Sequence, residues 1–381
     1  MKIPVILLLS LLFTACTTVP GTGPSTQWFQ DASFNPPSER IRAEDVFAVS
    51  EEMKRYVATE IAGQVRSKGQ QQALIDALYD KNQLKVEYDS AITRNAAQAF
   101  RDRSGNCLSL VIMTAAFARE MGLGVRYQNV MMDETWSRGG GMHLSVGHVN
   151  LTLAHSQPGP RADKDEIALL TIDFVPPDES RHLRTLPLDE NTVIALYMNN
   201  RAVESLVRGK LDDAYWWARE GIRQDPSLLA SYVTLGVIYR RHGQLDAAEK
   251  VLRHVLERDP HETKAMTNLV VVLDEQGRVE ESKVLEARLD LLQPNPPFHY
   301  FNLGMEAMKK GDFRVARADF EKELRRDPYN HEFHFWLAIA HLRLGEVGEA
   351  RSHLDIAVEF SPTRSDRDLY AAKLDKIKSL Q

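Results

Sequence analysis

The chain has 381 residues, of which 43% are hydrophobic and 26% are charged, a mixture typical of globular proteins with two or three domains. Its formal net charge of −6 shows no basic excess, which argues against nucleic acid as a partner. Because Cys16 and Cys107 are its two cysteines, the sequence offers no disulfide framework and no cysteine-rich zinc site.

Residues 1–15 have the features of a signal peptide. A charged start precedes an apolar run at residues 3–15, which is too short to span a bilayer as a mature helix. Phe-Thr-Ala-Cys, ending at Cys16, resembles the lipobox of bacterial lipoproteins, with phenylalanine where leucine is usual. The resemblance implies that Cys16 is lipidated and anchors the chain to a membrane without spanning it. Thr17, in place of aspartate, resembles lipoproteins of the outer membrane that face the periplasm.

Residues 16–40 are rich in proline, glycine, serine and threonine, which predicts a lipidated, flexible tether. Trp28 and Phe29 interrupt it, and either dock on the folded body or are incidental. From about Ala43 the apolar residues recur at helical spacing, with Ser50 as a cap, and further short helices are expected before Cys107.

Cys107 stands at the predicted start of a helix. Gly105 and Asn106 supply a turn and a capping group, a broad apolar face follows, and Gly122 ends the helix. A thiol in the first helical turn lies near unpaired backbone N–H groups and the positive end of the helix dipole, which favour the thiolate. The pattern therefore indicates a cysteine nucleophile.

After this helix the apolar period changes from 3.6 to 2, which predicts strands. They are expected at residues 125–130, 147–153 and 168–175. His148 begins the second strand and Asp173 lies near the end of the third. If these strands are antiparallel neighbours, the imidazole and the carboxylate meet opposite the start of the cysteine helix.

Residues 84–178 resemble the transglutaminase-like superfamily of the papain-like cysteine fold. The matching motifs are Gly-Asn-Cys at 105–107, Ala-Arg-Glu-Met-Gly-Leu-Gly-Val-Arg at 118–126, His-Val-Asn at 148–150 and Asp-Phe-Val-Pro at 173–176. Two departures are Asn150, where the family often has an aromatic residue, and the two residues between Asp173 and its proline. The resemblance implies an α+β papain-like domain in which the cysteine helix packs on a small antiparallel sheet.

By this resemblance Cys107 is the nucleophile, His148 the general base and acid, and Asp173 the group that orients the imidazole. The Cys107 N–H is the first candidate donor to an oxyanion, and Tyr88 or Asn106 are candidates for the second. His143, in the glycine-rich stretch at 138–143, is the rival base, in a loop that forms a flap or is merely flexible. The histidine and cysteine spacings match no zinc motif, and no metal or cofactor is expected.

From about residue 195 the chain repeats itself. Prolines at 226, 260, 294, 328 and 362 are 34 residues apart, and glycines at 209, 243, 277, 311 and 345 keep the same period. The pattern resembles the tetratricopeptide repeat (TPR), with two antiparallel helices per unit. The third of the five units matches worst, because Ser282 and Glu286 replace small or apolar residues. The expected second domain is an all-α solenoid with a final capping helix.

Solenoids of this type bind proteins or peptides on a concave face lined by the first helix of each repeat. The candidate groove residues by position are Asn199, Arg240, Asn268, Asn302 and His334. The predicted parts are a signal peptide (1–15), a lipidated tether (16–40), a transglutaminase-like domain (41–190), five repeats (195–362) and a capping helix (363–381).

The predicted function is that of a membrane-anchored cysteine acyl-transfer enzyme of the bacterial cell envelope. Its thioester chemistry allows amide hydrolysis, transamidation or deamidation, and its repeats would dock a protein or peptide. Two alternatives remain open. One is a catalytically inactive scaffold whose repeats assemble proteins at the membrane, and the other is a C39-like peptidase that clips a leader peptide.

Overall fold

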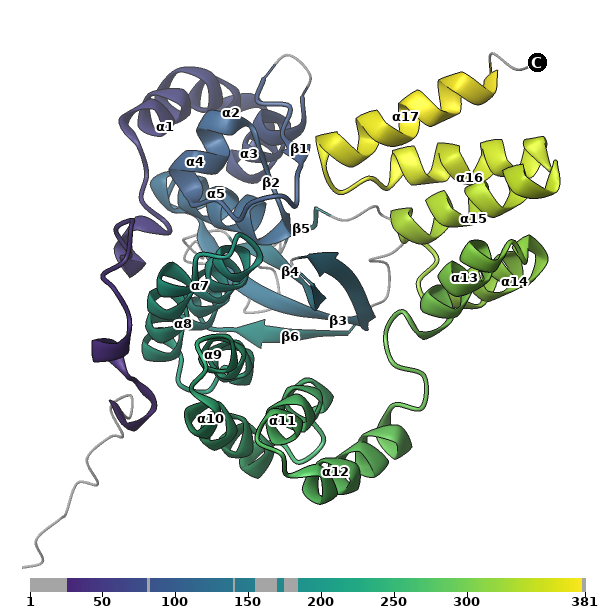
Figure 1. The fold of residues 1–381 in the computed structure, drawn as a ribbon. Helices are drawn as coiled ribbons and strands as arrows, with labels where there is room; N and C mark the ends of the chain where they lie inside the picture. The colour runs from purple at the N-terminus through teal and green to yellow at the C-terminus, as the bar shows by residue number, and fades with distance from the viewer. Residues whose placement is uncertain (1–25, 81–82, 140, 155–169, 175–183, 379–381) are drawn as a thin grey trace, which may run out of the picture.

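The computed structural model describes residues 26–80, 83–139, 141–154, 170–174 and 184–378. Figure 1 shows a mixed α/β domain that ends at about residue 188 and a curved array of helices that begins at Glu190. The predicted signal peptide and Cys16 lie outside the described residues. Within the described ranges, every helix is too short or too polar to serve as a membrane span.

Residues 26–40, here called the N-terminal strap, are not a flexible tether. The strap contains two 3-10 turns, η1 (Thr26–Trp28) and η2 (Asp31–Ser33), and the side chains of Trp28 and Phe34 are buried. The Phe34 ring stacks on Tyr215, with 3.9 Å between the ring centroids, and the Tyr239 hydroxyl donates to the Trp28 carbonyl at 2.6 Å. The tether prediction is therefore wrong for these residues, because two aromatic side chains bury themselves against the repeats.

Six short helical segments follow the strap. They are η3 (Ala43–Asp45), α1 (Glu51–Tyr56), the π-helical turn η4 (Val57–Ile61), α2 (Ala62–Lys68), α3 (Gln70–Tyr79) and α4 (Ala96–Asp102). The Ser50 side chain caps α1 by accepting from the Met53 N–H at 3.2 Å, as predicted. Asn95 caps α4 in a capping box with Gln98. Of these segments, α4 packs on the cysteine helix, and Tyr56 of α1 contacts Phe117 of the same helix.

Helix α5 (Cys107–Glu120) begins at the predicted cysteine. Its N-cap is Asn106, whose side-chain oxygen accepts from the Ser109 N–H at 2.9 Å, and Gly122 takes a left-handed φ of 74° just after the helix. Every residue from 107 to 118 is buried. A helix that is apolar all round belongs in the centre of a domain, and α5 packs on the strands β3 and β4.

The main sheet has the strand order β5-β4-β3-β6 and is antiparallel throughout. Its strands are β3 (Gly124–Gly139), β4 (Met142–Ala154), β5 (Leu170–Ile172) and β6 (Arg184–Leu188). Strands β3 and β4 pair up to Gly139 and Met142, so the described residues of the stretch expected as a flap or a flexible loop lie at the tip of a long hairpin, with Gly141 at φ 72°. A separate parallel pair joins β1 (Glu87–Tyr88) to β2 (Ser104–Gly105).

The second domain consists of five helix pairs and a capping helix, as the 34-residue period predicts. The pairs are α7 (Glu190–Val207) with α8 (Leu211–Gln224), α9 (Leu229–Arg241) with α10 (Leu245–Arg258), α11 (Thr263–Glu275) with α12 (Val279–Leu292), α13 (His299–Lys310) with α14 (Phe313–Leu324) and α15 (His331–Leu344) with α16 (Val347–Glu359). Helix α17 (Arg364–Lys378) caps the array. The first repeat begins at Glu190 rather than at about 195, and α7 packs directly on α5 and β3.

The stack is interrupted after the third repeat. The second helix of each other repeat packs on the next helix of the array, whereas α12 makes no comparable packing with α13, although both helices lie wholly within the described residues. Figure 1 shows the two helices separated by an extended connection. The array therefore has two parts, α7–α12 and α13–α17.

The second part of the array returns to the α/β domain. Arg138, at the hairpin tip, forms an ion pair with Glu332 of α15, and its guanidinium lies over the rings of Phe298 and Phe301 at 4.8 and 4.5 Å. The loop after β1 also reaches the end of the fifth repeat, where the Ser90 N–H donates to the Pro362 carbonyl at 3.0 Å. The α/β domain thus contacts both ends of the array.

Candidate active site

Three elements bring Cys107, His148 and Asp173 together. Cys107 is the first residue of α5, His148 lies on β4, and Asp173 directly follows β5, the neighbour of β4. His148 Nε2 lies 2.6 Å from Asp173 Oδ1. The imidazole also interacts with the Cys107 side chain, whose Sγ lies 3.9 Å from the Gly147 carbonyl. The structure therefore has the juxtaposition that the strand pattern predicts.

Asn150 completes the surroundings of Asp173. Its Nδ2 donates to Asp173 Oδ2 at 2.9 Å, so His148 and Asn150 each hold one carboxylate oxygen. Residues 148 and 150 point to the same face of β4 because side chains alternate along a strand. The sequence contained this information as a period of two, but the comparison with the family pattern treated Asn150 as a departure rather than as a partner of Asp173.

The site favours a charged histidine. Burial lowers the pKa of His148, but hydrogen bonds to Asp173 and Cys107, together with the negative charges of both groups, outweigh it and raise the pKa to about 9. His148 is 7% exposed and Cys107 8%. A buried imidazolium is stabilised by a negative charge beside it, and the Asp173 carboxylate supplies one at 2.6 Å.

Tyr88 lies next to the sulfur. The parallel pairing of β1 with β2 sets Tyr88 opposite Gly105, two residues before the cysteine. Desolvation raises the pKa of its hydroxyl, and the charge of Cys107 raises it further, so the phenol stays protonated at neutral pH. The Tyr88 side chain is 40% exposed. It remains a candidate oxyanion donor.

The other predicted neighbours of the site, Asn106 and His143, have different surroundings. The side chain of Asn106 is occupied: its Oδ1 accepts from Ser109 and its Nδ2 donates to Thr93 Oγ1 at 2.9 Å. These bonds show that Asn106 supports the start of the helix. His143 lies at the hairpin tip, opposite Arg138. His143 and His148 are five residues apart on the extended strand β4, which corresponds to about 17 Å between their backbones. The side chain of His143 lies outside the described residues.

The predicted groove residues lie on the first helices of the repeats, and several of them bond within the array. Asn199 accepts from the Thr234 hydroxyl at 2.8 Å, and Arg240 pairs with Glu275 at 3.0 Å. These bonds join one repeat to the next. They give both side chains a structural role in the stacking of the first three repeats.

The remaining three groove residues have different surroundings. Asn268 donates to the Lys264 carbonyl of its own helix at 2.8 Å, and Asn302 is exposed. His334 is buried, with Nδ1 2.9 Å from His353 Nδ1 and Nε2 2.8 Å from the Pro328 carbonyl. His334 therefore does not present its ring to a ligand in this structure, because the loop before α15 and helix α16 cover it.

The C-terminal half of the chain contains tetratricopeptide repeats. Residues 239–302 and 301–365 each match the tetratricopeptide repeat family. The type IV pilus assembly protein PilF of Pseudomonas aeruginosa is 25% identical over 174 residues, which are 45% of this chain and 69% of PilF. Cellulose synthase operon protein C of Pseudomonas fluorescens is 28% identical over 160 residues, 40% of this chain but 12% of that protein. Among solved structures, a thermophilic TPR protein of Thermus thermophilus has 19% identity and a TM-score of 0.30, over 47% of this chain and 98% of that one.

Repeats of this family imply a protein partner, because each unit adds surface to a continuous binding face. The matched residues 239–365 exclude the cysteine, the histidine and the aspartate described above.

Proposed function

We propose that the chain is a cysteine acyl-transfer enzyme whose repeats bind a protein partner or substrate. The observation that carries the proposal is the buried imidazole of His148, which hydrogen-bonds Asp173 and interacts with the Cys107 side chain. A structural histidine in an apolar core is more stable as the neutral form. The surroundings of His148 favour its charged form, and this is what a thiolate nucleophile requires.

The reaction would proceed through a thioester. The Cys107 sulfur forms a bond to an amide carbon of the substrate, the carbon–nitrogen bond breaks, and the His148 imidazolium gives its proton to the departing amine. Water or a second amine then attacks the thioester, its proton passes to His148, and the Cys107 thiolate is restored. Water gives hydrolysis or deamidation, and an amine gives transamidation.

Two donors would stabilise the oxyanion. The Cys107 backbone N–H lies in the first turn of α5, where such groups have no partner within the helix. The protonated Tyr88 hydroxyl would be the second donor, since its raised pKa keeps its proton at neutral pH. A Tyr88→Phe variant is expected to keep the thiolate of Cys107 but to slow acylation.

The substrate class follows from the two halves of the chain. The proposed acyl chemistry acts on amides, and the repeats favour a protein or peptide. The N-terminal sequence supports a lipid anchor at Cys16 and a position in the bacterial cell envelope. A protein or a cell-wall peptide at that membrane would supply the amide.

The test is the rate at which iodoacetamide alkylates Cys107 in the full chain, measured against pH on the Cys107 peptide by mass spectrometry. The native rate is expected to reach half its plateau well below pH 7, and His148→Ala should move that midpoint towards about 8.5, the value of an ordinary thiol. His261→Ala, a substitution at an exposed histidine of the repeats, serves as the matched control.

A second measurement addresses acyl transfer itself. Incubation with an activated acyl ester should add an acyl group to Cys107, detected by intact mass, and hydroxylamine should remove it. Native and His148→Ala curves that coincide near pH 8.5, with no acylation, would refute the enzyme. The chain would then be a scaffold that acts through its repeats.

A further inference from the structure

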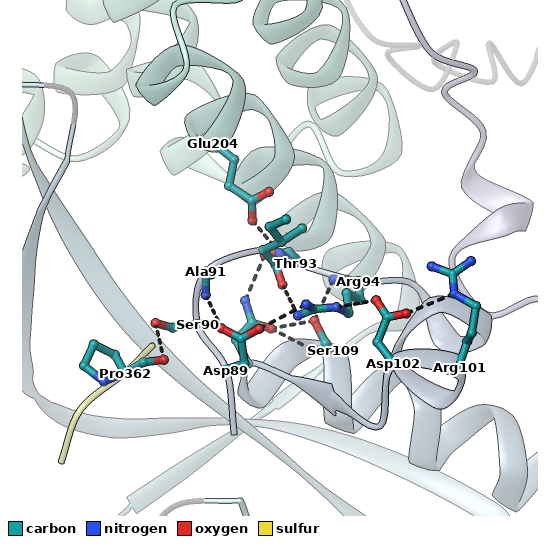
Figure 2. Close-up of polar contacts among 12 residues, drawn as sticks. Asp89, Ser90, Ala91, Thr93, Arg94, Arg101, Asp102, Ser109, Glu204 and Pro362 are labelled. Carbon is teal, nitrogen blue, oxygen red and sulfur yellow. Dashed lines mark hydrogen bonds and ion pairs between the residues drawn. The ribbon is translucent and has the colours of Figure 1, made fainter. Parts of the chain in front are cut away.

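The loop at residues 89–95, between β1 and α4, connects the cysteine helix to the repeats. Figure 2 shows Thr93 of this loop beside Glu204, which belongs to α7 of the first repeat. The Thr93 N–H donates to Glu204 Oε1 at 2.6 Å, and the Thr93 carbonyl accepts from Arg201 of the same helix at 3.3 Å. Helix α7 therefore binds both the backbone N–H and the backbone carbonyl of Thr93.

The same residue holds the start of the cysteine helix. Thr93 Oγ1 accepts from Asn106 Nδ2 at 2.9 Å, and Asn106 Oδ1 caps Ser109. The Ser109 hydroxyl in turn donates to Asn106 Oδ1 at 2.7 Å and accepts from the Arg94 N–H at 2.8 Å. A continuous set of hydrogen bonds therefore runs from Glu204 to the residue directly before Cys107.

These hydrogen bonds lie in a buried region, where the loss of a hydrogen-bond partner destabilises the fold. Thr93 and Ser109 are buried, so an unpaired polar group at either residue would lack water as a substitute. Burial raises the pKa of Glu204, while hydrogen bonds from Thr93 and the charges of Arg201 and Arg208 lower it and partly offset the effect. A carboxylate that accepts from a backbone N–H makes a stronger bond than a neutral acceptor does.

We propose that Glu204 of the first repeat is a positioning residue for Cys107. It fixes Thr93, Thr93 fixes the Asn106 cap, and the cap sets where the first turn of α5 places the sulfur and the Cys107 N–H relative to His148. The first repeat then completes the cysteine site rather than serving as a separable docking arm. The proposal rests on the proposed function, because it assigns Glu204 a role in the thiolate–imidazolium pair.

The outer end of the loop is held by the last repeat. The Ser90 backbone and side chain both contact the Pro362 carbonyl (Figure 2), at 3.0 and 3.1 Å. Asp89 pairs with Arg94 at 3.0 Å, and Arg94 also pairs with Asp102. Thr93, on the inner side of the loop, is therefore the residue that contacts both α7 and Asn106, the N-cap of α5.

The experiment compares Glu204→Ala, Glu204→Gln and Glu190→Ala in the full chain. Glu190 is a matched control because it also lies on α7 and pairs with Arg119, near the opposite end of α5. Each variant is assayed for its thermal midpoint and for the pH profile of Cys107 alkylation. Both Glu204→Ala and Glu190→Ala remove a contact between α7 and the α/β domain, so both should lower the thermal midpoint.

The pH profile separates positioning from stability. Glu204→Ala is expected to raise the midpoint of the Cys107 profile by about one pH unit, which lowers alkylation about tenfold at pH values below the native midpoint. Glu204→Gln should restore most of the native profile, since its amide oxygen still accepts from the Thr93 N–H. Glu190→Ala should leave the profile unchanged.

Three results overturn the proposal. In the first, the alkylation profile of Glu204→Ala equals that of the native chain, although the native midpoint depends on His148. This result removes the role of Glu204 and leaves the proposed enzyme standing. An equal change in Glu190→Ala means that any loss of α7 contact disturbs the site. If the native chain itself has no His148-dependent midpoint, both proposals fail together, and that outcome is recognised before any Glu204 variant is compared.

Discussion

The charge of His148 can be tested directly by removing its carboxylate partner. In Asp173→Asn, the single amide oxygen cannot serve both His148 and Asn150, which in the native chain bond the two carboxylate oxygens at 2.6 and 2.9 Å. One of these bonds must be lost, and the negative charge disappears in any case. Because burial alone lowers the pKa of His148, we expect it to fall from about 9 to 6.5 or below.

The expected change is large enough to measure. The difference between the ordinary value of 6.5 and about 9 corresponds to about 3 kcal/mol, at about 1.4 kcal/mol for each pH unit. A histidine whose pKa is raised by folding stabilises the folded state fully below its unfolded pKa, and this contribution is lost as the pH rises through the folded pKa. Asp173→Asn should therefore lower the unfolding midpoint strongly at pH 6 and much less at pH 10.

Ring-labelled histidine allows the titration to be followed by NMR, with the His148 signal assigned by its absence in His148→Ala. Asp290→Asn, at an exposed position of α12, is the control and should leave the His148 titration unchanged. A native His148 that titrates at or below pH 6.5 would refute the reasoning, since it would mean that Asp173 and Cys107 do not outweigh burial.

Two further predictions concern the packing that supports the site. Gly304→Ala should lower the stability of the second part of the array by about 1–3 kcal/mol, because its Cβ would lie 2.6 Å from Phe320 Cε1; urea unfolding measures this, and Gly348→Ala, with nothing within 4 Å of its Cβ, should cost nothing. Phe34→Ala, which removes a buried ring stacked on Tyr215, should cost about 3–5 kcal/mol of strap docking and expose residues 26–40 to protease, whereas Gln27→Ala at an exposed position should not; equal protection of the Phe34→Ala strap would contradict the packing.

The sequence predicted the elements whose signals are local or periodic. The 34-residue period required a repeated helix pair, and Asn106 before an apolar helical face marked the start of α5. The alternation around His148 and Asp173 predicted strands, and the family resemblance linked the two residues with Cys107. Each of these patterns depends on neighbours in the sequence, so it can be recognised without a structure.

Contacts between distant segments left no such signal. Trp28 and Phe34 lie in a stretch rich in polar residues and proline, and the residues that bury them lie about two hundred positions away on the repeats. The glycines at 139–141 suggested a loop, yet cross-strand pairs continue to the tip of the hairpin. The bond between Thr93 and Glu204 also joins two domains, and a solvated glutamate on a helix has the same appearance in the sequence.

The weak third repeat accounts for the path of the array. In the second and fourth repeats a glycine faces a large apolar side chain, Gly236 with Leu252 and Gly304 with Phe320. At the same positions the third repeat has Val270 and Glu286. The Glu286 side chain is exposed, because a charge cannot replace Leu or Phe in a packed seam.

Ser282 is the one buried residue of α12, so this helix offers the fourth repeat little surface on which to stack. An unbroken solenoid would continue its curve from α12. The interruption instead frees α13–α17 to reach the hairpin tip through Arg138 and the loop after β1 through Ser90. A residue pattern that is poor for stacking thus allows the two ends of the array to contact the domain that carries Cys107.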